Sequence, residues 1–266
     1  MIFVYLTILL LICYVILRSN KLEGFTVNKT NNFIETKTYR DERIYDDFYS
    51  YIYDDLFVTI PYIQELIQSI STLLNKNSNV LCIGSKTGHI VQLLSNDVSV
   101  RGLENSLAMV KIAKYKYPKN IYSYGNYLDH HLFKENQFTH IVLPMLSFNT
   151  IEDLNQLFVN ANKWLVHNGF MIIMSIDLEH IPISSLISHN SSSFFKSTFD
   201  YDIELKNNKM IDKIRDKQGN ERTDILSLYS HAEDKVIYNA HVNGLVYKYK
   251  NIMKQINSTI LVFQKK

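Results

Sequence analysis

Short apolar runs alternate with amphipathic segments between residues 79 and 177. The runs at 80–84, 98–104, 121–125, 138–146 and 170–177 have the length and composition of buried strands. The segments at 87–94, 106–117 and 151–166 have helical spacing, the second stopped by Pro118 and the third by Asn168-Gly169. Strands that alternate with helices form βαβ units. The pattern therefore predicts an α/β fold with a doubly wound, mostly parallel sheet and helices on both faces.

Different patterns flank this region. Residues 41–76 have apolar and aromatic positions at helical spacing and predict two helices, the second with Pro61 in its first turn. We interpret their aromatic stripe as packing. After Asp177, polar and apolar residues alternate, which predicts an antiparallel insertion with strands at 199–206, 209–216 and 224–230.

The remaining C-terminal segments complete the predicted domain. Residues 218–220 supply a hairpin turn, and the serine-rich stretch 184–197 predicts a mobile loop. A last helix is expected at 231–241, with Ser230 as its N-cap. Two final strands, 244–251 and 258–265, bring the main sheet to seven strands. We expect the insertion, residues 179–235, to form a lid that selects the substrate.

The N-terminus has a different character. Residues 2–17 carry no charged side chain and would extend about 24 Å as a helix, close to the roughly 30 Å of a bilayer core. We predict a transmembrane anchor at residues 1–18, a linker at 19–40 and a domain at 41–266. A cleaved signal peptide is one alternative, although a basic start and a small-residue cleavage site are missing. A buried core helix is the other, which so continuous an apolar run at a terminus disfavours. Arg18 and Lys21 follow the span, which predicts a cytosolic C-terminal domain by the positive-inside rule.

Charge and cysteine content narrow the class of function. The chain has 28 basic and 26 acidic side chains and a net charge of +2, so nucleic acid is not indicated as a partner. Of the two cysteines, Cys13 lies in the predicted anchor and Cys82 in a predicted buried strand, so no disulfide is expected. Cysteines and histidines do not cluster at zinc spacing, and no metal site is predicted.

The turn after the first strand of the sheet carries the candidate chemistry. It reads Gly-Ser-Lys-Thr-Gly-His from Gly84 to His89, and glycines there let a ligand approach the backbone closely. Glu104 ends the next strand, 16 residues after Gly88. A carboxylate at that place can accept hydrogen bonds from both ribose hydroxyls of a nucleoside. The two features predict a nucleoside-containing ligand at the carboxyl ends of the strands.

These segments resemble a known family. VLCIGSKTGHIVQLL, at 80–94, and VRGLENSLAMVKIAK, at 100–114, are similar to the first two motifs of class I S-adenosylmethionine-dependent methyltransferases. Residues 125–129 resemble the family's adenine loop, and 164–175 its entry to strand five. The resemblance implies a Rossmann-like fold, S-adenosylmethionine as cofactor and methyl transfer. The matching motif residues are Gly84, Gly88, Glu104, Ser106 and Met109.

The resemblance also implies site residues. Methyl transfer requires no fixed catalytic residue, and a general base is needed only when the nucleophile must lose a proton. Candidate bases are His130, His131 and Tyr127, which follow the third strand. Residues 44–57 resemble the start of small-molecule methyltransferases, and of membrane-anchored versions in giant DNA viruses, which implies a viral or internal host membrane. The implied cofactor-binding residues are Gly84, Ser85, Lys86, Gly88, Glu104, Asn105, Asn126 and Tyr127.

Three departures from the family pattern leave alternatives open. Cys82 replaces an Asp, His140 replaces an acid, and Lys86 replaces the middle glycine of the turn. Lys86 either crowds the cofactor's carboxylate or pairs with it. The leading hypothesis is a membrane-anchored methyltransferase that acts on a small molecule, lipid or protein. The alternative is a catalytically inactive domain that serves as a membrane-tethered binding module. A nucleotide-cofactor oxidoreductase is a third option, which the Ser106 and Met109 pattern disfavours.

Overall fold

The computed structural model describes residues 36–57, 60–144, 146–182, 184, 186–187, 191–253 and 258–266. The predicted anchor, residues 1–18, and residues 19–35 of the predicted linker lie outside these ranges. Within the described ranges, no helix is both long enough and apolar enough to span a bilayer.

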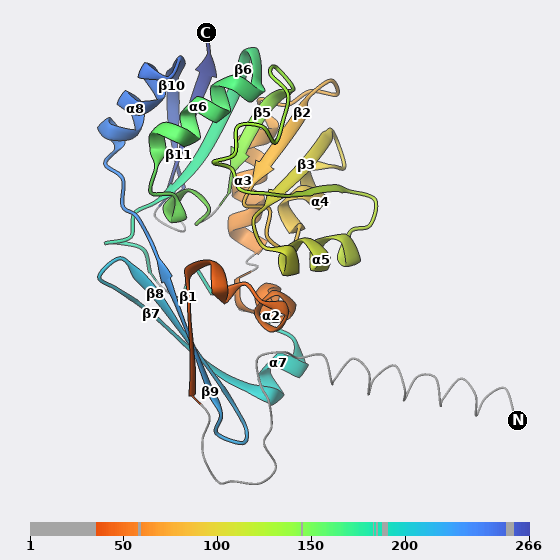
Figure 1. Ribbon diagram of the computed structural model, residues 1–266, viewed down its shortest axis with the longest axis vertical. Helices are drawn as coiled ribbons and strands as arrows, with labels where there is room; N and C mark the ends of the chain where they lie inside the picture. The colour runs from red at the N-terminus through yellow and green to blue at the C-terminus, as the bar shows by residue number, and fades with distance from the viewer. Residues whose placement is uncertain are drawn as a thin grey trace, which may run out of the picture.

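A seven-stranded sheet organises most of the chain (Figure 1). Its strand order is β10-β11-β6-β5-β2-β3-β4, in which β11 runs antiparallel to both of its neighbours and the other pairs are parallel. The chain reverses its direction of growth between β4 and β5, so a switch point lies between β2 and β5. The strands are β2 (Asn79–Ile83), β3 (Ser99–Glu104), β4 (Ile121–Tyr124), β5 (Phe138–Leu143), β6 (Leu165–Ile176), β10 (Leu245–Met253) and β11 (Ser258–Lys265).

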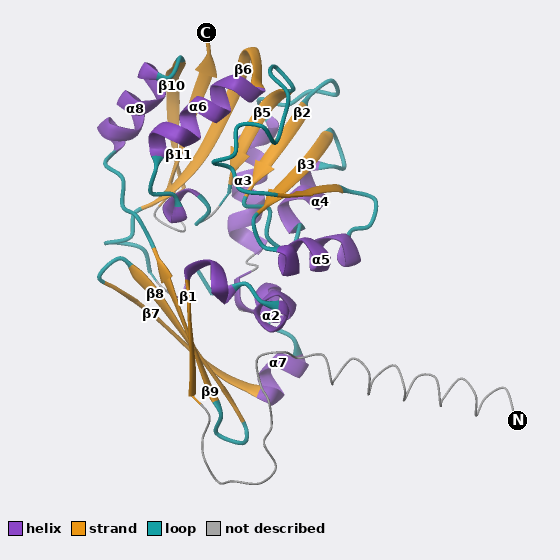
Figure 2. Cartoon of the chain, in the orientation of Figure 1, coloured by secondary structure: helices purple, strands orange, loops and turns teal. Residues whose placement is uncertain are grey.

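Helices cover both faces of this sheet, as predicted (Figure 2). The side chains of β2 alternate between two hydrophobic cores: Val80 and Cys82 face one, and Leu81 and Ile83 face the other. The first core takes side chains from α2 (Asp47–Phe57), α3 (Ile60–Ser71), α4 (His89–Leu94) and α5 (Leu107–Lys116), and the second from α6 (Leu154–Trp164) and α8 (Glu233–Val242).

One predicted boundary in this sheet is wrong. Asn168-Gly169 was expected to end the helix before the fifth strand, but α6 ends at Trp164 and β6 begins at Leu165. The strand register with β5 shifts between Phe138 and His140, so residues 166–169 form a bulge within β6. Asn168 takes a positive φ of 64° in that bulge, a conformation that Asn tolerates well.

A second sheet of four strands, in the order β1-β9-β8-β7, stands beside α2 (Figure 1). Strands β7 (Phe199–Lys206), β8 (Lys209–Asp216) and β9 (Glu221–Ser227) are antiparallel, as predicted, and Gly219 lies in the hairpin between β8 and β9. The fourth strand, β1 (Thr36–Arg40), pairs parallel with β9. These five residues were predicted to be linker because their own sequence has no alternation of apolar and polar positions. They form a strand because the edge of β9 supplies backbone hydrogen-bond partners.

Two further predictions in this region need correction. The serine-rich stretch predicted as a loop contains α7 (Ser193–Thr198), which begins where the Ser192 hydroxyl accepts a hydrogen bond from the Phe195 N–H. Helix α8 begins at Glu233 and its N-cap is Ala232, so Ser230 does not cap it.

Arg222 of β9 joins the second sheet to α2 and the segment before it. Its guanidinium is fully buried and donates to Asp224 (2.8 and 2.9 Å), to Asp46 (2.6 Å) and to the carbonyl of Ile44 (2.8 Å). It also lies 4.0 Å from the ring centre of Tyr39 in β1. A buried cation with these partners fixes the second sheet against α2.

Candidate functional site

The turn between β2 and α4 adopts a conformation that its glycines permit. Gly84 and Gly88 have positive φ angles of 74° and 85°, which L-residues with side chains rarely adopt. A Cβ on Gly84 would lie 2.3 Å from the Ser147 Oγ, and one on Gly88 would lie 2.4 Å from the Tyr122 hydroxyl oxygen. Both positions therefore require glycine, and the turn packs closely on the loop after β5 and on β4.

Glu104, the last residue of β3, holds this turn in place. Its side chain is 1% exposed. Oε2 accepts the backbone N–H of Lys86 at 2.9 Å, and Oε1 accepts those of Asn105 at 3.0 Å and Ser106 at 3.1 Å. A carboxylate oxygen accepts about two hydrogen bonds, so Oε1 is saturated. Oε2 retains capacity for one more donor.

The Lys86 side chain extends toward Glu104 and Tyr45. The sequence had suggested only how it would meet the cofactor's carboxylate, by crowding it or by pairing with it. The Lys86 ammonium lies 3.9 Å from Glu104 Oε2 and 3.9 Å from the ring centre of Tyr45. Burial lowers the pKa of this ammonium, but the Glu104 carboxylate and Tyr45 outweigh that effect and raise it, so Lys86 stays charged. The ammonium thus lies within ion-pair distance of the Glu104 oxygen that has an acceptor site left.

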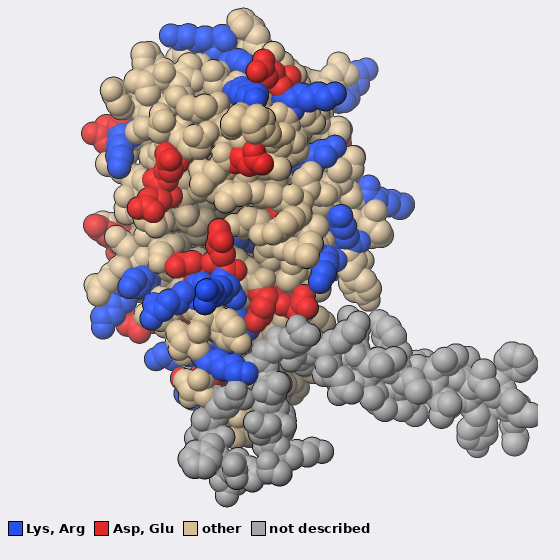
Figure 3. All heavy atoms as spheres, in the orientation of Figure 1, with Lys and Arg blue, Asp and Glu red and all other residues tan. Residues whose placement is uncertain are grey.

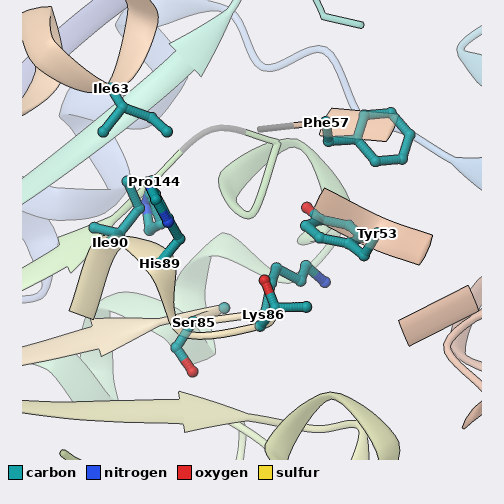
Figure 4. A pocket seen from close by; sticks show the side chains of 10 residues that line it. Tyr53, Phe57, Ile63, Ser85, Lys86, His89, Ile90 and Pro144 are labelled. Carbon is teal, nitrogen blue, oxygen red and sulfur yellow. The ribbon is translucent and has the colours of Figure 1, made fainter. Parts of the chain in front are cut away.

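Three small pockets surround Lys86, and all three have it in their lining. The first, of about 410 Å³, lies between the turn and helices α2 and α3, and includes Gly84, Ser85 and Tyr53 (Figure 4). In Figure 4 the Ser85 hydroxyl points away from this pocket. The second, of about 370 Å³, is lined by Leu103, Asn105, Gly125 and Tyr127, among others.

The third pocket, of about 270 Å³, lies between α2 and the second sheet. Tyr49, Tyr53 and Phe57 of α2, with Tyr45 just before the helix, form one wall, and Met210 and Leu226 come from β8 and β9. The three α2 residues recur every four positions, so each lies about one turn beyond the last on the same side of the helix. The sequence interpretation treated the aromatic positions of residues 41–76 as packing and did not single out these four residues as the lining of a pocket.

Most of the predicted cofactor-binding residues meet at the carboxyl ends of β2, β3 and β4. Gly84, Ser85, Lys86, Asn105 and Tyr127 line the first or the second pocket. Glu104 contacts the turn directly, and Gly88 shapes it without lining a pocket.

Asn126, His130 and His131 are not brought to these pockets. All three are exposed and line none of them. Asn126 instead accepts the Leu128 N–H at 3.0 Å, and the two histidine rings stack on each other with centres 3.7 Å apart. Burial raises the pKa of Tyr127 to about 12, so its hydroxyl keeps its proton at neutral pH.

The other two departures from the family pattern lie in the core. Cys82 is fully buried, and burial raises the pKa of its thiol to about 12, so it is a neutral core group. His140 is 4% exposed, contacts the Thr139 hydroxyl and the Leu73 carbonyl, and stacks on Phe170. Neither residue lines a pocket around Lys86.

Comparisons with known proteins agree with this geometry. Residues 81–173 match the family model described as a methyltransferase domain, a range that includes the glycine turn and Glu104. No curated protein matches the chain in sequence.

Solved structures of methyltransferases share the fold. The CcbJ methyltransferase of Streptomyces caelestis has 15% identity and a TM-score of 0.65, over 85% of this chain and 99% of its own. An S-adenosylmethionine-dependent methyltransferase of Clostridium acetobutylicum has 14% identity and a TM-score of 0.60, over 82% and 97%. CalS10 of Micromonospora echinaspora, an amino pentose methyltransferase solved with S-adenosylmethionine bound, has 12% identity and a TM-score of 0.56, over 77% and 90%. The chain thus contains a segment that matches a methyltransferase domain, and it shares the fold of these solved methyltransferases.

Proposed function

We propose that the chain is an S-adenosylmethionine-dependent methyltransferase that acts at a membrane surface on a small molecule, lipid or protein. The observation that carries this proposal is the buried carboxylate of Glu104, which faces the glycine turn and has one hydrogen-bond site left on Oε2. That site suits a ribose hydroxyl, and the pockets on either side of the turn suit the two ends of an adenosyl amino acid.

The residues present fit this cofactor in two respects, and one side chain must move to admit it. The pocket lined by Leu103, Asn105 and Tyr127 has the mixed apolar and polar walls that an adenine ring and its ribose need. The pocket beside Gly84 and Ser85 exposes backbone to the methionine part. Lys86 must turn away from Glu104 when a ribose hydroxyl takes its place, which a flexible side chain permits.

Once bound, S-adenosylmethionine supplies a methyl group on an activated sulfonium. The protein's residues then align the acceptor with that group and exclude water. Tyr45, Tyr53 and Phe57 contribute apolar walls near the glycine turn. Glu104 orients the ribose and through it the rest of the cofactor.

The charge distribution supports an acceptor other than nucleic acid. Acidic and basic side chains are interspersed on the face shown in Figure 3, and the net charge is +2. A nucleic-acid partner usually requires a strong basic field. Relatives at 12% identity include an amino pentose methyltransferase and a sugar N-methyltransferase, KedS8 of Streptoalloteichus, which favours a small molecule among the acceptor classes.

One observation favours the alternative of an inactive, membrane-tethered binding module. The Lys86 ammonium stands at Glu104 Oε2, where a ribose hydroxyl would bind. Under this alternative Lys86 holds the site closed, and S-adenosylmethionine does not bind until Lys86 is removed.

A binding experiment tests the proposal. Full-length protein in detergent micelles is titrated with S-adenosylmethionine carrying a tritiated methyl group, and bound label is measured by equilibrium dialysis. We expect saturable binding that weakens roughly tenfold or more in Glu104→Gln, equivalent to about 1.4 kcal/mol or more. Glu135→Gln, at an exposed position, is the matched control and should bind like the wild type. Equal binding by all three proteins would remove Glu104 from the site.

Membrane attachment is the second part of the proposal. It rests on the uncharged run at residues 2–17 and on Arg18 and Lys21 after it, and it places the domain on the cytosolic side. Full-length protein reconstituted with phosphatidylcholine vesicles should float with them in a density gradient and resist extraction by carbonate. Protein that lacks residues 2–17 should stay at the bottom. Release of the full-length protein by carbonate would rule out a spanning anchor.

A further inference from the structure

The pocket between α2 and the second sheet lies next to both pockets assigned to the cofactor. It shares Lys86 and Thr150 with the pocket beside Asn105, and Lys86, Tyr53 and Phe57 with the pocket beside Gly84. A molecule in this third pocket would therefore lie next to the middle of a bound cofactor, where the transferable methyl group is. This is the place for a methyl acceptor.

A buried carboxylate adjoins this pocket through one tyrosine. Tyr49 lines the pocket, and its hydroxyl donates a 2.5 Å hydrogen bond to Asp212 Oδ2 in β8. Asp212 is 1% exposed and also accepts the Tyr201 hydroxyl on Oδ1 at 3.1 Å. Tyr201 belongs to β7 and lines none of the three pockets. Two hydroxyls of the same kind thus hold one carboxylate, but only Tyr49 lines the pocket.

The charges around Asp212 come from several elements. Asp224 and Arg222 of β9 and Asp46 before α2 form a linked ion cluster nearby. Burial raises the pKa of Asp212 to about 7, and Asp224 adds to that rise, whereas the hydroxyls of Tyr49 and Tyr201 and the Arg222 charge lower it. Asp212 can therefore gain and lose a proton near neutral pH, as a general base must.

We propose that the tyrosine-lined pocket binds a small aliphatic amine as the methyl acceptor, and that Tyr49, backed by Asp212, takes the proton that the acceptor nitrogen must lose. This inference rests on the proposed function and names the acceptor class and the proton acceptor for it. Tyr49 is the residue that touches the acceptor, and Asp212 acts through Tyr49 as a positioning residue and proton store.

The proton and electron balance of the step is complete with these groups. The nitrogen lone pair forms the new N–C bond while the C–S bond of the sulfonium breaks and leaves its electron pair on sulfur. The nitrogen proton passes to the Tyr49 oxygen as the Tyr49 proton passes to Asp212 Oδ2. The positive charge of the sulfonium is thereby matched by loss of the negative charge on Asp212.

An amine suits this arrangement better than an alcohol does. An alkylammonium has an ordinary pKa near 10, about three units above the pKa of about 7 of the Asp212 carboxyl, so Asp212 can accept its proton at a moderate cost. An alcohol binds its proton far more tightly. Lys86 carries the only formal charge among the described lining residues of the pocket. Its ammonium disfavours a second cation nearby and so favours the reactive, uncharged form of the amine.

Three probes that differ only in the nucleophilic atom test the acceptor class. Full-length protein in micelles is incubated with tritiated S-adenosylmethionine and with benzylamine, benzyl alcohol or phenylmethanethiol, and labelled product is measured. We expect methylation of benzylamine at least roughly tenfold faster than of the other two. Faster methylation of the alcohol or the thiol, or of none of the three by protein that binds the cofactor, would overturn the amine assignment while the proposed function stands. Failure of the protein to bind S-adenosylmethionine would contradict both the amine assignment and the proposed function.

Two tyrosine variants test the role of Tyr49 against a purely structural role. Tyr49→Phe and Tyr201→Phe each remove one hydroxyl from Asp212. We expect kcat for benzylamine to fall roughly 100-fold in Tyr49→Phe, in the range of lost acid–base catalysis. Tyr201→Phe removes a hydrogen bond from Asp212 but no group that touches the acceptor, so its loss in kcat should be at least roughly tenfold smaller. Cofactor Kd and thermal midpoint, measured alongside, establish that both variants are folded. Equal losses in the two variants would contradict the proposal.

The pH profile tests Asp212. In the wild type, kcat at saturating benzylamine should rise as pH increases through about 7 and then level off, because the carboxylate must be unprotonated to accept the proton. Asp212→Asn should lose this inflection. An unchanged profile in Asp212→Asn would show that another group takes the proton.

Discussion

The backbone N–H of Lys86 donates a 2.9 Å hydrogen bond to Oε2 of Glu104, 18 residues later in the chain, and the Lys86 ammonium lies 3.9 Å from the same oxygen. One carboxylate oxygen thus fixes the glycine turn and attracts a side chain of that turn. A nucleoside ribose would use the same oxygen. Under the proposed function we therefore expect competition between Lys86 and the ribose for Glu104 to limit cofactor affinity.

Removal of the Lys86 side chain should strengthen cofactor binding. Lys86 has a φ of 48°, so Lys86→Gly also suits the backbone there. We expect the Kd for S-adenosylmethionine to fall roughly tenfold, equivalent to about 1.4 kcal/mol, in calorimetric titrations. Lys86→Ala removes the ammonium but keeps a Cβ at this positive φ, so it separates loss of the charge from the change in backbone freedom, and it should show most of the gain. Weaker binding in both variants would mean that Lys86 pairs with the cofactor.

A side chain at Gly88 should disrupt the turn. A Cβ there would lie 2.4 Å from the Tyr122 hydroxyl oxygen, at a φ of 85°. We expect Gly88→Ala to lower the free energy of unfolding by roughly 2–4 kcal/mol, the combined scale of overpacking and a left-handed backbone. Adding Tyr122→Phe, which deletes that oxygen, should recover part of the loss in urea denaturation. A double variant no more stable than Gly88→Ala would show that the strain lies in the backbone alone.

The buried arginine should be essential for the second sheet. Arg222→Met leaves Asp224 and Asp46 without their cation, and we expect a loss of roughly 3–5 kcal/mol in the free energy of unfolding. Arg215→Met is the matched control, because Arg215 also pairs with a carboxylate, Glu221 at 2.5 Å, but is exposed. It should cost at most about 1 kcal/mol. Similar losses in the two variants would refute a special role for Arg222.

Protein stability should depend on pH through Asp212. Its folded pKa of about 7 lies above its ordinary 3.8, so the folded state binds a proton more tightly than the unfolded state between those values. The contribution of Asp212 to stability is therefore lost as pH rises from about 4 to 7. Relative to the wild type, Asp212→Asn should gain up to a few kcal/mol across this window, since one pKa unit corresponds to about 1.4 kcal/mol. Asp97→Asn, at an exposed position, should show no such trend in urea denaturation.

Much of the main sheet could be predicted from the sequence because each βαβ unit carries its own pattern. The runs ending at Gly84 and Glu104 combine a strand with a turn that local residues determine. The candidate cofactor-binding residues follow from these ends, since parallel strands bring their carboxyl ends to one edge.

Features that depend on distant contacts could not be predicted in the same way. Strand β1 forms because β9, about 185 residues later, offers an edge. The direction of the Lys86 side chain depends on Tyr45, which the turn sequence does not contain. His130 and His131 follow β4, whose carboxyl end does lie at the candidate site. Their loop, however, is closed by hydrogen bonds from backbone N–H groups to the side chains of Asn126 and Asp129, and both histidines lie outside the pockets.

Calorimetric titration of the full-length protein with S-adenosylmethionine and, separately, with NAD⁺ tests the central claim most directly. The glycine turn and Glu104 predict saturable binding of S-adenosylmethionine with a Kd in the micromolar range, which corresponds to a binding free energy on the order of −8 kcal/mol. They predict no heat of binding from NAD⁺. Saturable binding of NAD⁺ with none of S-adenosylmethionine would contradict the claim.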